Sequence, residues 1–165
     1  MNALLAALTV VLAAAVALAI PGGAAALLLC VPLALVAGLL LSNGAGEQRP
    51  FLLRVFVAGL LLRMGVGVVI NGFALQEFFG GDALTYDWLG GHLLEAWRGD
   101  LPMMPEMKQW ALAGGWGMVY LVAAIYAVVG RNMLAVQFFN AVVGAATAPV
   151  IFLCARHIFQ NVRVA

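Results

Sequence analysis

Charged residues are scarce in this sequence: only 9% of its 165 residues are Asp, Glu, Lys or Arg, whereas 65% are apolar. Soluble domains are about a quarter charged, so this chain has too little polar surface to cover a core in water. The lipid bilayer is therefore the expected solvent, because lipid tolerates apolar side chains that face outward. The net charge of +1 also gives no electrostatic basis for binding nucleic acid.

Residues that bind metals or act as nucleophiles are equally few. Cys30 and Cys154 lie in separate apolar runs without Cys-x-x-Cys or Cys/His spacing, so we expect packing residues and no metal or disulfide framework. Ser42 is the only serine and stands at the end of an apolar run, which argues against a serine nucleophile. His92 and His157 are isolated. No metal and no cofactor is therefore expected.

Long apolar runs dominate the chain and predict an all-α, polytopic membrane protein with about four spanning helices. A helix needs about 20 apolar residues to cross the hydrocarbon core. The predicted spans are residues 3–20, 24–42, 51–75 and 133–155. Pro21-Gly22-Gly23 breaks the helix and makes the first two spans a tight hairpin. A cleaved signal peptide is the alternative reading of residues 1–20, but this stretch has no Lys or Arg.

The predicted topology follows from length and charge. Residues 43–50 form a short polar turn, and Arg49 within it and Arg54 just after it favour the cytoplasmic side. The basic C-terminal end after residue 155 also favours that side. Residues 116–130 would span only about 22 Å, less than the hydrocarbon core of about 30 Å. We therefore expect this segment to be an interfacial or re-entrant helix on the outer face, with both termini cytoplasmic.

The outer loop, residues 76–113, carries six of the seven acids against two basic residues, a net charge of −4. A helical pattern over residues 83–98 places Tyr86, Leu89, Leu93 and Trp97 on one face, which predicts an amphipathic helix lying on the membrane. Asp87 falls towards the opposite side, which should face water.

Asp82 begins this pattern and has two compatible interpretations. Asp is a favoured N-cap residue, which would make its role structural. A carboxylate at the membrane–water boundary could also accept a proton from an attacking hydroxyl.

Arg63 lies midway in the third apolar run, where a guanidinium is costly and usually has a partner. It could pair with an acid of the outer loop or with a lipid phosphate. Alternatively, it snorkels to an interface.

The chain has an apolar span, then an outer loop that begins with Asp, then a short aromatic-rich helix and a further span. This order resembles the N-terminal part of GT-C membrane glycosyltransferases, in the group similar to dolichyl-phosphate-mannose–protein mannosyltransferases. In that family the first outer loop carries the catalytic acid, commonly as Asp-Glu or Asp-x-x-x-Tyr, and Asp82 and Tyr86 in GGDALTYDW match it. A later family piece, N-x-x-x-G-A…AR-x-x-F, is matched by Asn140, Gly144, Ala145, Ala155, Arg156 and Phe159.

Three features depart from the family. Ala83 follows Asp82 where the family has Glu, the hairpin at residues 3–42 is extra, and the chain stops where the family continues. The resemblance thus divides the chain into an N-terminal hairpin, residues 1–50, and a GT-C-like module, residues 51–165. Within the module, a span at 51–75 and a span at 133–155 flank an outer loop with interfacial helices at 76–130. The chain is expected to be a fragment or one module of a split enzyme, inactive alone, which needs a missing C-terminal part or partner subunit.

The resemblance implies an inverting transfer of a sugar from a polyprenyl-phosphate donor to a lipid, glycan or protein acceptor. The expected location is the outer face of the plasma (inner) membrane. Asp82 would be the catalytic base. Tyr86, Asp87, Arg63 and Lys108 would bind substrate, with Arg63 or Lys108 as the cation that stabilises the departing phosphate. The alternative is a non-catalytic membrane subunit or scaffold, in which the acids only keep the loop in water.

Overall fold

The computed structural model describes residues 3–78, 82–100 and 117–160, and these residues form helices and turns without any β-strand. The all-α prediction is therefore confirmed for the described part of the chain. The helices are α1 (Ala3–Ala19), α2 (Gly23–Ala45), the 3₁₀ turn η1 (Gly46–Gln48), α3 (Arg49–Gly72), α4 (Asp82–Arg98), α6 (Gly117–Val129) and α7 (Met133–Phe159).

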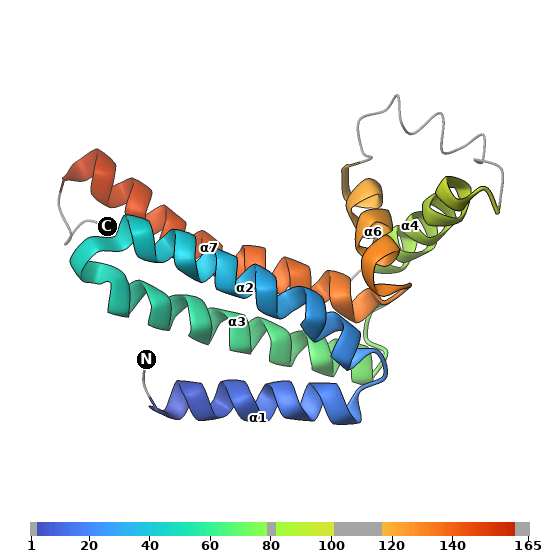
Figure 1. Ribbon diagram of the computed structural model, residues 1–165, viewed down its shortest axis with the longest axis horizontal. Coiled ribbons are helices and arrows are strands. Elements are labelled where there is room, and N and C mark those ends of the chain that lie inside the picture. Colours follow the sequence, from blue (N-terminus) through green and yellow to red (C-terminus); the bar gives the residue numbers. More distant parts are fainter. Residues whose placement is uncertain (1–2, 79–81, 101–116, 161–165) are drawn as a thin grey trace.

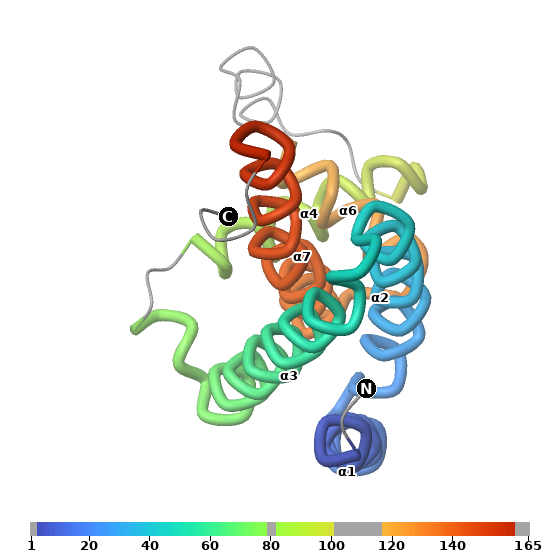
Figure 2. The backbone as a smooth tube through the Cα atoms, turned by 90° about the vertical axis from the view of Figure 1, so that its left-hand side faces the viewer, coloured from blue at the N-terminus to red at the C-terminus, as the bar shows by residue number. Residues whose placement is uncertain are grey.

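Four long helices, α1, α2, α3 and α7, run side by side as a bundle (Figures 1 and 2). Helix α7 packs against both α2 and α3, and α1 packs against the same two helices. The start of α1, the turn between α2 and α3, and the end of α7 lie at one end of the bundle (Figure 1). Helices α4 and α6 stand at the opposite end, where α7 begins. We call this opposite end the α4–α6 end.

Two helical stretches, Gly23–Gly72 and Met133–Phe159, are long and apolar enough to cross a membrane. The first consists of α2, η1 and α3, and Figure 1 shows that it folds back on itself at η1. Only 22% and 28% of the most apolar windows of the two stretches are buried in the protein. Apolar side chains that face outward suit lipid better than water. The four-span arrangement stays a prediction, since α1 is shorter, with 17 residues.

The reversal between α1 and α2 is a tight hairpin, as the sequence predicts. Gly22 has a φ of 73°, which favours glycine because a Cβ is disfavoured there. A Cβ on Gly23 would lie only 2.0 Å from the carbonyl oxygen of Val16, so the two helices approach as closely as their backbones allow. The Nδ2 of Asn132 donates to the carbonyl oxygen of Gly22 at 2.8 Å, which ties this hairpin to the start of α7.

The predicted polar turn over residues 43–50 is wrong in extent. Helix α2 continues to Ala45, and the reversal is confined to η1, where Gly46 has a φ of 55°. The extra turn of α2 is stabilised from α7: Arg156 donates to the carbonyl oxygens of Gly44 and Ala45 at 3.1 and 3.0 Å. These carbonyls have no partner within the helix, so a distant side chain extends α2.

Helix α4 packs on α6 and makes little contact with the four long helices. Leu89 and Leu93 are buried against Val119 and Ala123 in a small core of their own. The prediction that this apolar face lies on the bilayer is therefore wrong, because α6 covers it. The close approach depends on Gly90, where a Cβ would lie 2.4 Å from a methyl carbon of Val122.

Candidate functional site

A polar pocket of about 420 Å³ lies between α4, α6 and α7, and we call it the α4–α7 pocket. Asp82 and Tyr86, one helical turn apart at the start of α4, line it together with Asp87. Its remaining lining comes from Ala83 of α4, from Met118, Val122 and Tyr126 of α6, and from Met133, Val136, Gln137 and Asn140 of α7. Three of the five predicted site residues, Asp82, Tyr86 and Asp87, are thus brought together.

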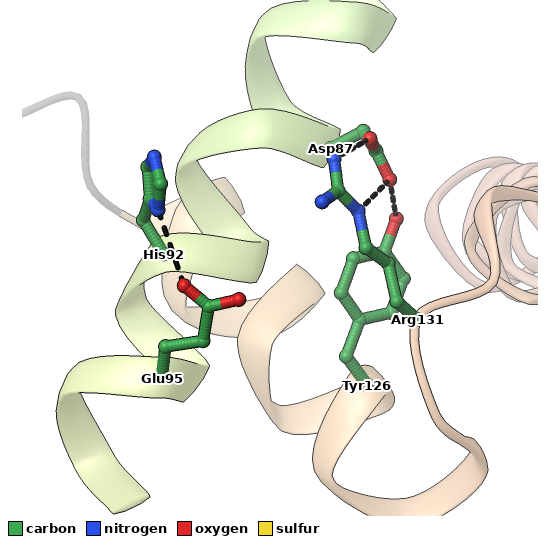
Figure 3. A network of polar contacts seen from close by, with 5 residues as sticks. All are labelled: Asp87, His92, Glu95, Tyr126 and Arg131. Carbon is green, nitrogen blue, oxygen red and sulfur yellow. Dashed lines mark hydrogen bonds and ion pairs between the residues drawn. The ribbon is translucent and has the colours of Figure 1, made fainter. Parts of the chain in front are cut away.

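Asp87 is the centre of a hydrogen-bonded network (Figure 3). The hydroxyl of Tyr126 donates to Oδ1 of Asp87 at 2.5 Å, and Nη2 of Arg131 donates to Oδ2 at 2.6 Å. The Nε of Arg131 is 3.4 Å from Oδ1. Only 17% of the Asp87 side chain is exposed, so the prediction that it faces water is wrong. Both carboxylate oxygens are occupied by the protein, which makes this residue an anchor of α4.

The protonation states in this network are set by burial and by the partners. Partial burial alone would raise the pKa of Asp87, but hydrogen bonds from Arg131 and Tyr126, and the charge of Arg131, together hold that pKa below its usual value. Burial and the neighbouring carboxylate raise the pKa of Tyr126. At neutral pH, Asp87 is therefore an anion and Tyr126 a neutral donor, and a carboxylate held this way is a poor base.

Asp82 differs from Asp87 in its exposure to solvent and in its hydrogen bonding. It is exposed and makes no hydrogen bond or ion pair with the other described residues. It lies in the first turn of α4, where the helix dipole stabilises an anion. A carboxylate that lines a pocket and has free oxygens can accept a proton from a bound hydroxyl. Glu95 faces His92 instead, at 3.4 Å (Figure 3), and does not line the pocket.

Arg63 lies in a second hollow, of about 610 Å³, between α3 and α7, which we call the α3–α7 groove. Its guanidinium rests on Gly144, where a Cβ would lie 2.8 Å from the guanidinium carbon. The predicted pairing with an acid of the outer loop is not found among the described residues, in which Arg63 has no ion pair. Lys108, the other predicted cation, lies outside the described residues.

Three residues at or beside the pocket, Arg131, Tyr126 and Gln137, are not predicted from the sequence. A signal for Arg131 was available, because it is a lone basic residue between two apolar runs, at a position that the predicted topology puts outside, where the positive-inside rule disfavours a cation. Such a cation is expected to have an acidic partner. Tyr126 belongs to the segment 116–130, which was expected to be an interfacial or re-entrant helix, and its side chain is fully buried in the protein. Comparison with protein-family models, curated proteins and solved structures finds no match to this chain.

Among the described residues, no group of three or more His, Cys, Asp or Glu side chains could hold a metal ion. The side chains that line the α4–α7 pocket can accept a proton and form hydrogen bonds, and Arg63 places a cation in the adjacent groove.

Proposed function

We propose that the chain is part of a GT-C-type membrane glycosyltransferase, which moves a sugar from a polyprenyl-phosphate donor to an acceptor at the outer membrane face. One observation carries the proposal: Asp82, the residue that matches the catalytic acid of that family, lines a pocket and has no partner among the described residues. The other pocket carboxylate, Asp87, is occupied by Tyr126 and Arg131.

The proposed reaction is a direct displacement at the anomeric carbon. Asp82 takes the proton of the acceptor hydroxyl, whose oxygen forms the new glycosidic bond. The bond from the anomeric carbon to the donor phosphate breaks, and its electron pair leaves with the phosphate. Arg63 supplies positive charge to the leaving phosphate, with Lys108 as a second candidate. Tyr86 lies beside the reacting hydroxyl because it lines the same pocket as Asp82.

The proposed topology places α1, α2, α3 and α7 across the plasma membrane, with both termini cytoplasmic. The arrangement of the bundle supports it, because the start of α1 and the end of α7 share one end and α4 and α6 occupy the other (Figure 1). The α4–α6 end would then be the outer end. A lipid-linked donor would keep its tail in the bilayer and present its sugar there.

The Asp87 network gives some support to a non-catalytic subunit as a second candidate. It shows that one acid of the predicted outer loop serves to fix α4 and has no free oxygen for a substrate. If Asp82 had a comparable role, such as stabilising the start of α4 by its charge, the chain would be a scaffold. The two candidates differ in one respect: only the enzyme transfers sugar.

The test uses membrane vesicles from cells that naturally contain the chain, with the chain depleted or restored. Vesicles receive a radiolabelled sugar on a polyprenyl phosphate or on a nucleotide. We expect restored vesicles to incorporate label from the polyprenyl-phosphate donor several-fold faster than depleted ones, with no chain-dependent incorporation from the nucleotide donor. Equal incorporation by depleted and restored vesicles, across the common polyprenyl-phosphate hexoses, would reject the enzyme and leave the scaffold.

A further inference from the structure

Two residues of α7, Gln137 and Asn140, line both the α4–α7 pocket and the α3–α7 groove. They are three positions apart, so they lie on the same face of the helix. The pocket and the groove are therefore neighbouring hollows with a shared polar wall. A ligand long enough to occupy both would pass along this wall.

Gln137 has an unmet hydrogen-bonding capacity. Its Oε1 is buried and has no hydrogen-bond partner among the described residues. A Cβ on Gly67 of α3 would lie 3.6 Å from this oxygen, so α3 passes close beside it. A buried acceptor without a donor costs about 1–3 kcal/mol, and a ligand hydroxyl that reaches this position would remove that cost.

The groove changes character along its length. From the α4–α6 end inward, the wall on α7 carries first Gln137, then Asn140, then Gly144 with the guanidinium of Arg63 above it. Gln137 and Gly144 are about 10 Å apart along the helix. Beyond Arg63 the lining is wholly apolar, with Gly59, Val55 and Ala148. Along α7 the environments are thus neutral polar, then cationic, then apolar, whereas the part of α3 between Arg63 and the α4–α6 end contributes the apolar Val66 and Ile70.

We infer that the pocket and the groove form one binding site for an amphiphile with a hydroxylated headgroup, a phosphate and an apolar tail. The hydroxyls contact Gln137 and Asn140, the phosphate contacts Arg63, and the tail follows the apolar end of the groove. The inference rests on the proposed function for placing the headgroup beside Asp82. It adds Gln137 as a residue that recognises the headgroup and fixes the direction in which the ligand lies.

The test measures lipid binding, without any transfer reaction. The full chain in nanodiscs is compared by native mass spectrometry for binding of phosphatidylinositol, which has a hydroxylated ring on its phosphate, and of phosphatidic acid, which has none. Phosphatidylcholine serves as the background lipid, and soluble inositol phosphate tests whether the tail is needed. We expect binding of both anionic lipids and much weaker binding of the soluble compound.

Two substitutions separate the two polar contacts. Gln137→Met keeps the length of the side chain but not its hydrogen bonds, and should weaken phosphatidylinositol binding about fivefold while phosphatidic acid binding is unchanged. Arg63→Gln should weaken both lipids at least about tenfold. The matched controls are Thr147→Val on α7 and Arg54→Gln on α3, neither of which lines the site. They should bind both lipids like the parent.

The inference is overturned if Gln137→Met leaves phosphatidylinositol binding unchanged or weakens both lipids equally, or if Arg63→Gln has no effect. Should Gln137→Met fail to fold, Asn140→Leu is expected to give the same selective loss, and its absence counts equally against the inference. A chain that binds as expected but never transfers sugar would reject the proposed function alone. A chain that transfers sugar but shows no selective loss would reject this inference alone.

Discussion

The anchoring of α4 through Asp87 gives a quantitative prediction for a double-mutant cycle. Asp87 has two partners of different character: Tyr126 is fully buried, whereas 54% of the Arg131 side chain is exposed. Ion pairs with an exposed partner contribute about 0.2–1 kcal/mol. A hydrogen bond to a charged group contributes about 1.5–3 kcal/mol. We therefore expect the hydroxyl of Tyr126, and not the guanidinium of Arg131, to be the stronger anchor of Asp87.

Asp87→Ala should lower the free energy of unfolding by about 2–3 kcal/mol, because it leaves the buried Tyr126 hydroxyl without a partner. The coupling energy between Asp87→Ala and Tyr126→Phe should be about 1.5–2 kcal/mol. That between Asp87→Ala and Arg131→Ala should be about 1 kcal/mol or less. The assay is equilibrium unfolding in mixed micelles, followed by circular dichroism and by the fluorescence of Trp88 and Trp97 on α4.

The order of the two coupling energies decides whether burial or charge sets the strength of the anchor. A coupling to Arg131 larger than that to Tyr126 would show that charge and not burial sets the strength of the anchor. No coupling to either partner would show that Asp87 does not fix α4 at all. His92→Ala serves as a control on the same helix, because its contact with Glu95 lies within one turn of α4, and it should cost well under 1 kcal/mol.

Three further predictions concern pH, packing and topology. Because the folded-state pKa of Asp87 is lowered, its stabilising effect should be complete at neutral pH and be lost as the pH falls below about 4. The pKa of Tyr126 is raised, so its contribution should be lost only above about pH 10. The free energy of unfolding measured from pH 3 to 11 checks both expectations, and a loss of stability between pH 5 and 8 would contradict them. Gly90→Ala should destabilise the α4–α6 contact by about 1–3 kcal/mol. Gly65→Ala, with open space around it, should not destabilise the protein, and equal effects of the two variants in thermal unfolding would count against the packing argument. A cysteine placed at Gln160, in a variant without the two native cysteines, should resist an impermeant thiol reagent added from outside, and labelling from outside would reject the topology.

The sequence predicts the helices well because the signals that define them are local. The predicted spans 3–20, 24–42 and 133–155 correspond to α1, α2 and α7 within a few residues. The long apolar runs and the Pro-Gly-Gly breaker are enough for this. The boundary at residues 43–50 was predicted less well, because the partner of the last carbonyls of α2 is Arg156, more than 100 positions away.

The candidate site could be predicted only in part, for a related reason. The spacing of Asp82 and Tyr86 along α4 follows from the helical pattern, and the structure places both in one pocket. The same pattern shows that α4 has an apolar face but not what covers it, and α6 takes the place expected of the bilayer. The partners of Asp87 are 39 and 44 positions away, so no local pattern reveals that its charge is neutralised within the protein.

The central claim is that Asp82 acts as the base in sugar transfer, and a comparison of Asp82→Asn with the parent chain tests it most directly. Asn keeps the size and most of the capping ability of Asp but cannot take up a proton. In vesicles that carry the restored chain and a polyprenyl-phosphate donor, Asp82→Asn should lower the transfer rate at least about 100-fold. Expression and membrane insertion should be unchanged, and Glu95→Gln should retain most of the activity. Transfer by Asp82→Asn at the parent rate would contradict the claim and leave Asp82 a structural residue at the start of α4.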